Sequence, residues 1–217
     1  MPLLDRAFLW VRSCSLCYRF TLFTRILLAA GFLPTGMVKL AGLRFTTISV
    51  EHPVGAFFEA MYQTGLYWRF LGMSQVLAAV LLLLPACAHL GAALFLPIMI
   101  NIFVITISMG FRGTPVVTGL MLLAVVYLVA WDFHRFRALL TRRPLHEPVP
   151  EPRLDRWERV GFAVFAVSLL AFFGATRGMV SLGLGPALIV TGTLAGLATV
   201  ARFLWVWWFE LRRPAVG

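Results

Sequence analysis

The sequence contains six runs of about 20 mostly apolar residues, and this feature limits the possible folds more than any other. About 20 residues of α-helix, each rising 1.5 Å, cross the hydrocarbon core of a bilayer. The runs are Leu22–Ala41, Trp68–Leu84, Leu90–Ser108, Thr114–Trp131, Val160–Thr176 and Pro186–Trp208. Only 13% of the residues are charged, about half the fraction found in soluble domains. We therefore expect an all-α polytopic membrane protein whose solvent is the lipid bilayer.

The net charge of +10 is concentrated in the connections between these runs. In a six-span arrangement, twelve arginines fall on one side and four on the other. The first side carries Arg6, Arg12, Arg19, Arg135, Arg137, Arg142, Arg143, Arg153, Arg156, Arg159, Arg212 and Arg213, and the second carries Arg44, Arg69, Arg112 and Arg177. This bias is the positive-inside pattern. It predicts a multi-pass protein of the inner membrane with both termini cytoplasmic and Ser181 outside, and it predicts no nucleic-acid partner.

The connections divide the chain into four predicted parts. Residues 1–21 are a cytoplasmic N-terminal segment, and residues 22–140 are a four-helix transmembrane bundle. Residues 141–159 are rich in proline and charge, which is typical of a linker, here cytoplasmic. Residues 160–217 add two C-terminal transmembrane helices. Gly192 and Gly196 in the last helix form a small-xxx-small pair through which the chain could form oligomers.

The connection between the first two spans contains a candidate interfacial helix near residues 53–64. Val54, Phe57, Phe58 and Met61 follow the helical spacing i, i+3, i+4, i+7, and Pro53 suits a first helical position. Such a pattern is typical of an amphipathic helix that lies in the membrane interface. The alternative is an irregular cap without a helix.

The first span carries two cations, Arg25 and Lys39. A charge inside a span costs about 2.5–3.5 kcal/mol on the insertion scale and marks a functional candidate. Fourteen residues separate the two, so they share one helix face about 21 Å apart. They either line a site on this face or extend to opposite interfaces.

Three polar residues mark the inner faces of the next spans: Gln75, Asn101 and Thr118. Gln75 shares a face with small residues, and Asn101 lies one turn after Pro97. We expect Gln75 and Asn101 to face the bundle rather than lipid. With Thr118 they either line a ligand cavity or act as hydrogen-bonding contacts between helices.

The acidic residues predicted on the outer side are Glu51 and Glu59. A lysine beneath an interfacial helix is costly unless an acceptor meets it. We therefore expect one of the two, and Glu59 before Glu51, to pair with Lys39 or Arg69. No metal site is predicted, because nothing in the spacing of the Glu and His residues fixes a ligand geometry.

Cys14 and Cys17 form a CxxC pair before the first span. Such a pair can cycle between dithiol and disulfide. The cytoplasmic side is reducing, however, and a thioredoxin-like strand context is absent. We therefore expect both cysteines to be dispensable.

The first span reads Arg25 to Gly36-Met37-Val38-Lys39-Leu40, which resembles the R…GxxKL signature of the DoxX-like membrane proteins. The stretch from Glu51-His52-Pro53 to Leu84, together with Asn101-Ile102 and Trp131-Asp132, is also similar to that family. The resemblance covers about residues 20–140. It implies a four-helix membrane bundle, and some members accompany thiol or sulfur redox systems that use quinone.

Three functions compete on this basis. The first is an accessory or ligand-binding subunit without an activity of its own, which works with a redox partner protein. It would bind quinone or a similar apolar ligand. The candidate ligand-binding residues are Arg25, Lys39, Glu59, Gln75, Asn101 and Thr118. The second is a small-solute transporter or channel. The third is a thiol oxidoreductase that uses Cys14 and Cys17.

Overall fold

A computed structural model describes residues 3–140, 149, 152–177 and 185–211 of the chain. Within these residues the protein is all-helical and contains no strand. Ser181 and the arginines Arg142, Arg143, Arg212 and Arg213, which entered the topology prediction, lie outside the described residues. So does most of the predicted linker.

The described helices follow one another through short connections. They are α1 (Leu3–Ser13), α2 (Ser15–Leu40), α3 (Pro53–Gln63), α4 (Leu66–Leu83), α5 (Ala88–Ser108), α6 (Thr114–Trp131), α7 (Phe133–Leu140), α8 (Arg156–Thr176) and α9 (Gly185–Leu211). Five of them (α2, α4, α5, α6 and α8) are long and apolar enough to cross a membrane. In α9 the apolar stretch Val190–Val206 is shorter.

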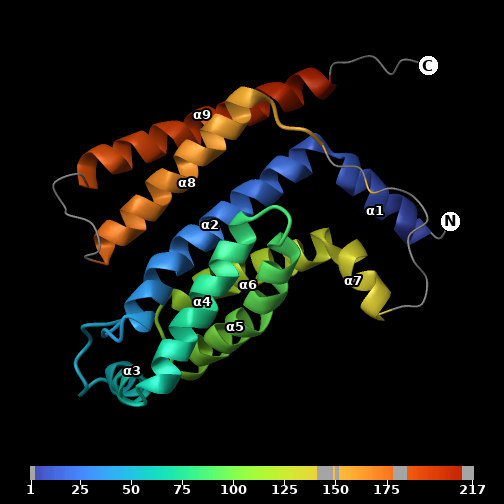
Figure 1. The fold of residues 1–217 in the computed structure, drawn as a ribbon. Coiled ribbons are helices and arrows are strands. Elements are labelled where there is room, and N and C mark those ends of the chain that lie inside the picture. The colour runs from blue at the N-terminus through green and yellow to red at the C-terminus, as the bar shows by residue number, and fades with distance from the viewer. Residues whose placement is uncertain (1–2, 141–148, 150–151, 178–184, 212–217) are drawn as a thin grey trace, which may run out of the picture.

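The long helix α2 is the centre of the fold (Figure 1). It packs against α4 and α6 on one side and against α8 and α9 on the other. The helix α1 and the C-terminal end of α9 lie toward one end of the molecule, and α3 lies at the other (Figure 1). We call these the α1 end and the α3 end.

Hydrophobic side chains fill the space between α2, α4, α5 and α6. The cluster consists of Leu28, Ala29, Phe32, Ala78, Ala79, Leu82, Ala92, Phe95, Met99, Val125 and Leu128, all buried. Small residues let α2 and α4 come close, because a Cβ on Gly72 would lie 2.6 Å from the carbonyl oxygen of Gly36. A smaller cluster of Ile26, Phe162 and Phe165 joins α2 to α8.

The helix predicted near residues 53–64 is present as α3. Its first residue is Pro53, and the side chain of His52 caps it by accepting a hydrogen bond from the Val54 amide at 3.2 Å. Val54 and Gly55 are buried against the rest of the α3 end. The irregular alternative for this segment is therefore wrong.

Candidate functional site

The two cations of the first span lie at opposite ends of α2, and each is buried in a different kind of polar site. Lys39 belongs to the α3 end and Arg25 to the α1 end. The apolar cluster around Phe32 and Ala79 lies between them.

Lys39 is 6% exposed, and among the described residues its ammonium group donates to neutral oxygens. It donates to the side-chain oxygen of Gln75 at 3.1 Å and to the carbonyl oxygen of Thr35 at 3.4 Å. Its Nζ lies 4.1 Å from the ring centre of Phe45 and 5.6 Å from that of Trp68, within the range of cation–π attraction. We call Lys39, Gln75, Phe45 and Trp68 the Lys39 site.

The connection after α2 forms one wall of the Lys39 site. Trp68, 1% exposed, donates its indole N–H to the carbonyl oxygen of Leu43 at 2.9 Å and so holds this connection against α4. Arg177, at the end of α8, lies 4.6 Å from the Phe45 ring centre and donates to the Phe45 carbonyl at 3.3 Å. Phe45 therefore has two cations beside its ring.

Glu59 pairs with Arg44, and the predicted pairing with Lys39 or Arg69 is wrong. Two hydrogen bonds of 2.9 Å join the Arg44 guanidinium to the two carboxylate oxygens of Glu59. These bonds, with a further one from Gln63, lower the pKa of Glu59 to about 2. Arg44 lies in the connection after α2, only fifteen residues before Glu59 in the sequence.

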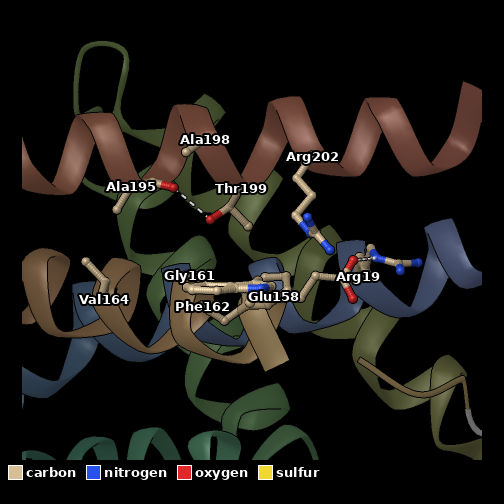
Figure 2. A pocket seen from close by; sticks show the side chains of 10 residues that line it. Arg19, Glu158, Gly161, Phe162, Val164, Ala195, Ala198, Thr199 and Arg202 are labelled. Carbon is tan, nitrogen blue, oxygen red and sulfur yellow. Dashed lines mark hydrogen bonds and ion pairs between the residues drawn. The ribbon is translucent and has the colours of Figure 1, made fainter. Parts of the chain in front are cut away.

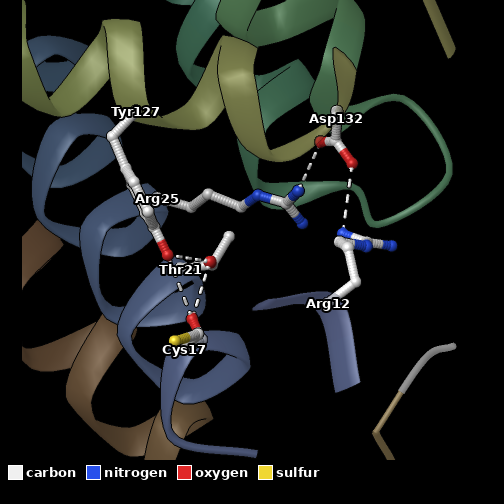
Figure 3. Close-up of polar contacts among 6 residues, drawn as sticks. All are labelled: Arg12, Cys17, Thr21, Arg25, Tyr127 and Asp132. Atoms are coloured by element: carbon white, nitrogen blue, oxygen red, sulfur yellow. Dashed lines mark hydrogen bonds and ion pairs between the residues drawn. The ribbon is translucent and has the colours of Figure 1, made fainter. Parts of the chain in front are cut away.

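At the α1 end, Asp132 accepts contacts from two arginines on different helices (Figure 3). Arg25 of α2 donates to Oδ2 at 2.7 Å, and Arg12 of α1 lies 3.6 Å from Oδ1. All three residues are at least nine-tenths buried. Arg12 also lies over the Trp131 ring, 4.5 Å from its centre. One carboxylate thus holds α1, α2 and the end of α6 together.

A second set of polar contacts lies one turn away on α2 (Figure 3). The Tyr127 hydroxyl is 2.8 Å from Thr21 Oγ1, and both contact the carbonyl oxygen of Cys17, at 3.2 and 2.8 Å respectively. The three cysteines Cys14, Cys17 and Cys87 are free thiols. Among the described residues, no three His, Cys, Asp or Glu side chains gather as metal ligands would.

Thr118 and Asn101 do not join Gln75 in a common cavity. Thr118 is buried and its hydroxyl lies 2.9 Å from that of Thr106, between α6 and α5. Asn101 is exposed on the outer face of α5, as is Pro97. The prediction that Gln75 faces the bundle is confirmed, and the same prediction for Asn101 is wrong. Because α5 is apolar on every side, its sequence gave no reliable sign of which face is buried.

Gly192 and Gly196 face inward, against α8, and so do not offer a free surface for oligomers. A Cβ on Gly192 would lie 2.7 Å from Ser168 Cβ, and one on Gly196 would lie 3.1 Å from the Phe165 ring. The small-xxx-small pair therefore serves packing within one chain.

Near the α1 end, Arg19 of α2 forms a buried ion pair with Glu158 of α8 at 2.6 Å. Glu158 also completes a capping box with Asp155 at the start of α8. Asp155 in turn pairs with Arg202 of α9. A cavity of about 210 Å³ opens beside these groups, between α8 and α9 (Figure 2).

Comparison with known proteins places the chain in a family. No family model and no solved structure matches it. The uncharacterized protein YwoB of Bacillus subtilis (strain 168) is 31% identical over 128 residues, which cover 56% of this chain and 82% of YwoB. The chain belongs to the YwoB family. YwoB is itself uncharacterized, so membership in its family assigns no activity to this chain.

The predicted site residues of this YwoB-family chain did not include Asp132 or Glu158, which neutralise buried arginines. A signal for both exists in the sequence. The chain has nine acidic residues against nineteen basic ones, and Asp132 and Glu158 stand directly beside apolar runs. Acids in that position are candidate partners for cations within the spans.

Proposed function

We propose that this YwoB-family chain is a DoxX-like integral membrane protein that binds a quinone or a similar apolar ligand with carbonyl oxygens. It would act as an accessory or ligand-binding subunit of a membrane redox system, beside a redox partner protein, rather than as an enzyme of its own. The observation that carries this proposal is the Lys39 site, a buried ammonium group with neutral partners and aromatic walls.

A buried charge without a counter-charge is expensive, and in membrane proteins such groups are usually functional. An ammonium group has three N–H donors, and the described residues supply Lys39 with two acceptors, Gln75 and Thr35. A quinone carbonyl is a suitable third acceptor. The rings of Phe45 and Trp68 offer faces on which a flat apolar ligand can pack.

Access to the Lys39 site would require movement of the connection that carries Phe45. The cavity beside this connection, lined by Arg44, Phe45 and Glu59 among others, measures about 10 Å³, at most the space of one water. Residues 41–52 form no helix, and Phe45 is half-buried. A ligand that displaces the Phe45 ring would reach Lys39 from the α3 end.

The membrane arrangement of the proposal has six spans in the inner membrane. The helices α2, α4, α5 and α6 form a four-helix bundle, with α8 and α9 as the two-helix extension. The arginines Arg6, Arg12, Arg19, Arg135, Arg153 and Arg156 at the α1 end support a cytoplasmic location for that end.

The two other functions receive less support. A transport path would have to connect Arg25 with Lys39, and buried apolar side chains such as Phe32 and Leu28 occupy the space between them. Thiol chemistry would use the free thiols of Cys14 and Cys17, and it would take place at the end of the molecule opposite to the Lys39 site.

The test is whether quinone co-purifies with the full chain in mild detergent, detected by absorbance and mass spectrometry. Lys39→Met removes the ammonium group at similar length, and we expect it to lower the bound quinone about tenfold, or about 1.4 kcal/mol of binding. Arg112→Gln, an exposed cation at the same end, is the matched control and should leave the amount unchanged. Equal amounts in wild type and Lys39→Met would refute the proposal.

A further inference from the structure

The cavity between α8 and α9 exists because both helices carry small side chains where they face each other (Figure 2). Gly161 on α8 faces Thr199 on α9, whose hydroxyl would lie 3.0 Å from a Cβ at Gly161, and Ala195 and Ala198 of α9 also line the space. Phe162 and Val164 add apolar surface. The space of about 210 Å³ is therefore apolar along most of its length and open on one side to the surroundings of the protein.

The end of this cavity nearest α1 is charged. Arg202 extends from α9 towards Arg19 and Glu158, as Figure 2 shows. Asp155, which pairs with Arg202, is 45% exposed, whereas Glu158 is buried. Two guanidinium groups and two carboxylates thus stand together with no net charge.

Aromatic residues mark the depth of the cavity in the membrane. Trp157 lines it and is 72% exposed. Trp205 and Trp208, in the turns of α9 that follow Arg202, are 65% and 50% exposed. Exposed tryptophans of membrane helices gather at the level of the lipid headgroups. The charged end of the cavity therefore lies among headgroups, and its apolar part lies at the start of the acyl chains.

We propose that this cavity is a binding site for one zwitterionic, amine-bearing phospholipid of the ethanolamine type. The phosphate would contact the guanidinium groups of Arg202 and Arg19, the lipid ammonium would contact Asp155 and Glu158, and the first part of one acyl chain would lie against Phe162 and the alanines. The site is distinct from the Lys39 site, which lies at the other end of α2.

The balance of charges selects the headgroup. A purely anionic headgroup is attracted by the two arginines and repelled by the two carboxylates, and it brings no cation for those carboxylates. A choline headgroup carries a quaternary nitrogen that cannot donate hydrogen bonds, whereas an ethanolamine ammonium donates three, as a lysine does. Charge-assisted hydrogen bonds are the stronger kind, so the ethanolamine lipid matches both halves of the site.

The experiment uses the full chain, delipidated in detergent and titrated with phosphatidylethanolamine, phosphatidylglycerol or phosphatidylcholine of identical acyl chains. Native mass spectrometry counts the bound lipids. We expect one phosphatidylethanolamine to bind about tenfold more tightly than either of the other lipids. Arg202→Gln and Ala198→Phe, which remove a charge and fill the cavity, should each abolish this preference.

Two exposed positions that do not line the cavity provide matched controls. Arg159→Gln removes the same charge from α8, and Ala201→Phe adds the same ring to α9. Both should retain the preference. Equal binding of the three lipids, a preference for phosphatidylglycerol or phosphatidylcholine, or an unchanged preference in Ala198→Phe would each overturn the proposal.

Discussion

At the scale of single residues, Arg25 and Lys39 show two ways of holding a cation inside one helix. Arg25 meets a carboxylate, Asp132, and Lys39 meets an amide oxygen, a carbonyl and two rings. A buried pair is strongly destabilised when one partner is lost, because a charge then remains uncompensated. The Arg25 contact with Asp132 is therefore structural in character, whereas the two acceptors that Lys39 meets among the described residues are fewer than the three N–H groups of its ammonium.

Asp132→Asn should lower the free energy of unfolding by about 3–5 kcal/mol, because it leaves two buried guanidinium groups with a neutral partner. Thermal unfolding in detergent measures this loss. In an Arg25→Met background the same change should cost clearly less, since one of the two cations is already gone. Equal costs in both backgrounds would show that the Arg25–Asp132 contact does not stabilise the fold.

Glu59 should make the stability of the α3 end depend on pH, in a range below the ordinary titration range of a glutamate. Its pKa falls from 4.5 to about 2 because of the hydrogen bonds from Arg44 and Gln63. Because the pKa of Glu59 is lower in the folded protein, the ionised carboxylate stabilises the fold fully above pH 4.5. This stabilisation is lost as the pH falls towards 2. The difference in unfolding temperature between wild type and Glu59→Gln should be constant from about pH 8 to 5 and shrink below that.

The control for this measurement is Glu51→Gln. Glu51 is exposed, and no contact of its carboxylate occurs among the described residues. Its substitution should leave the unfolding temperature unchanged across the same pH range. A difference for Glu59→Gln that persists at the lowest pH would contradict the ionic origin of the effect.

The sequence predicted which residues of α2 matter but not their partners. Helical spacing placed Arg25 and Lys39 on one face, and both are buried. Asp132 lies 107 residues from Arg25 in the sequence, and Gln75 lies 36 residues from Lys39. Such pairings depend on how whole helices pack, which local spacing does not determine. Arg44, in contrast, was near enough to Glu59 to be considered.

At the scale of helices, the contact between α2 and α4 depends on glycine. A Cβ on Gly72 would lie 2.4 Å from the backbone nitrogen of Leu40 and 2.6 Å from the Gly36 oxygen. Backbone atoms cannot move aside as a flexible side chain does. The pair lets the helices approach closely, and this brings Gln75 within reach of Lys39.

Gly72→Ala should therefore cost about 1–3 kcal/mol of stability through overpacking, and it should also weaken ligand binding at the Lys39 site. Gly31 in α2 is the matched control, because a Cβ there would meet no atom within 4 Å. Gly31→Ala should be neutral or stabilising by up to about 1 kcal/mol. Thermal unfolding of the two variants, measured in parallel, gives the difference in stability. Equal unfolding temperatures would show that the close approach of α2 and α4 at Gly72 does not limit the side chain there.

Helix positions were easier to predict than helix faces. The predicted bounds of Thr114–Trp131 match α6, since long apolar runs identify membrane helices directly. Helix α2 begins at Ser15, seven residues before the predicted start at Leu22, and Arg19 in this first part of the helix is buried in an ion pair with Glu158. Asn101 was misplaced because every face of α5 is apolar.

At the scale of the whole molecule, the ion pair between Arg19 and Glu158 and the cluster of Ile26, Phe162 and Phe165 hold α8 against α2, and α9 packs mainly on α8. The bundle and the extension are thus one packed unit around a shared helix. The proposed topology assigns the α1 end to the cytoplasm, and this can be examined with single cysteines.

In a chain whose native cysteines are replaced by serine, Arg112→Cys should react with an impermeant maleimide in intact cells. Arg112 lies between α5 and α6 at the α3 end. Arg153→Cys, in the connection before α8, should react only after the membrane is permeabilised. The opposite pattern would invert the topology, and labelling of both in intact cells would rule out the six-span arrangement.

The central position of α2 has a consequence for biosynthesis. Among the described long helices α2 is synthesised before the others, yet Arg25 pairs with a residue made 107 positions later, and Arg19 with one made 139 positions later. At a synthesis rate of about 5–20 residues per second, roughly 5–20 s pass between the synthesis of Arg25 and that of its partner Asp132. During that interval the nascent helix has to remain beside the insertion machinery or water, and release into lipid becomes favourable only when α6 arrives.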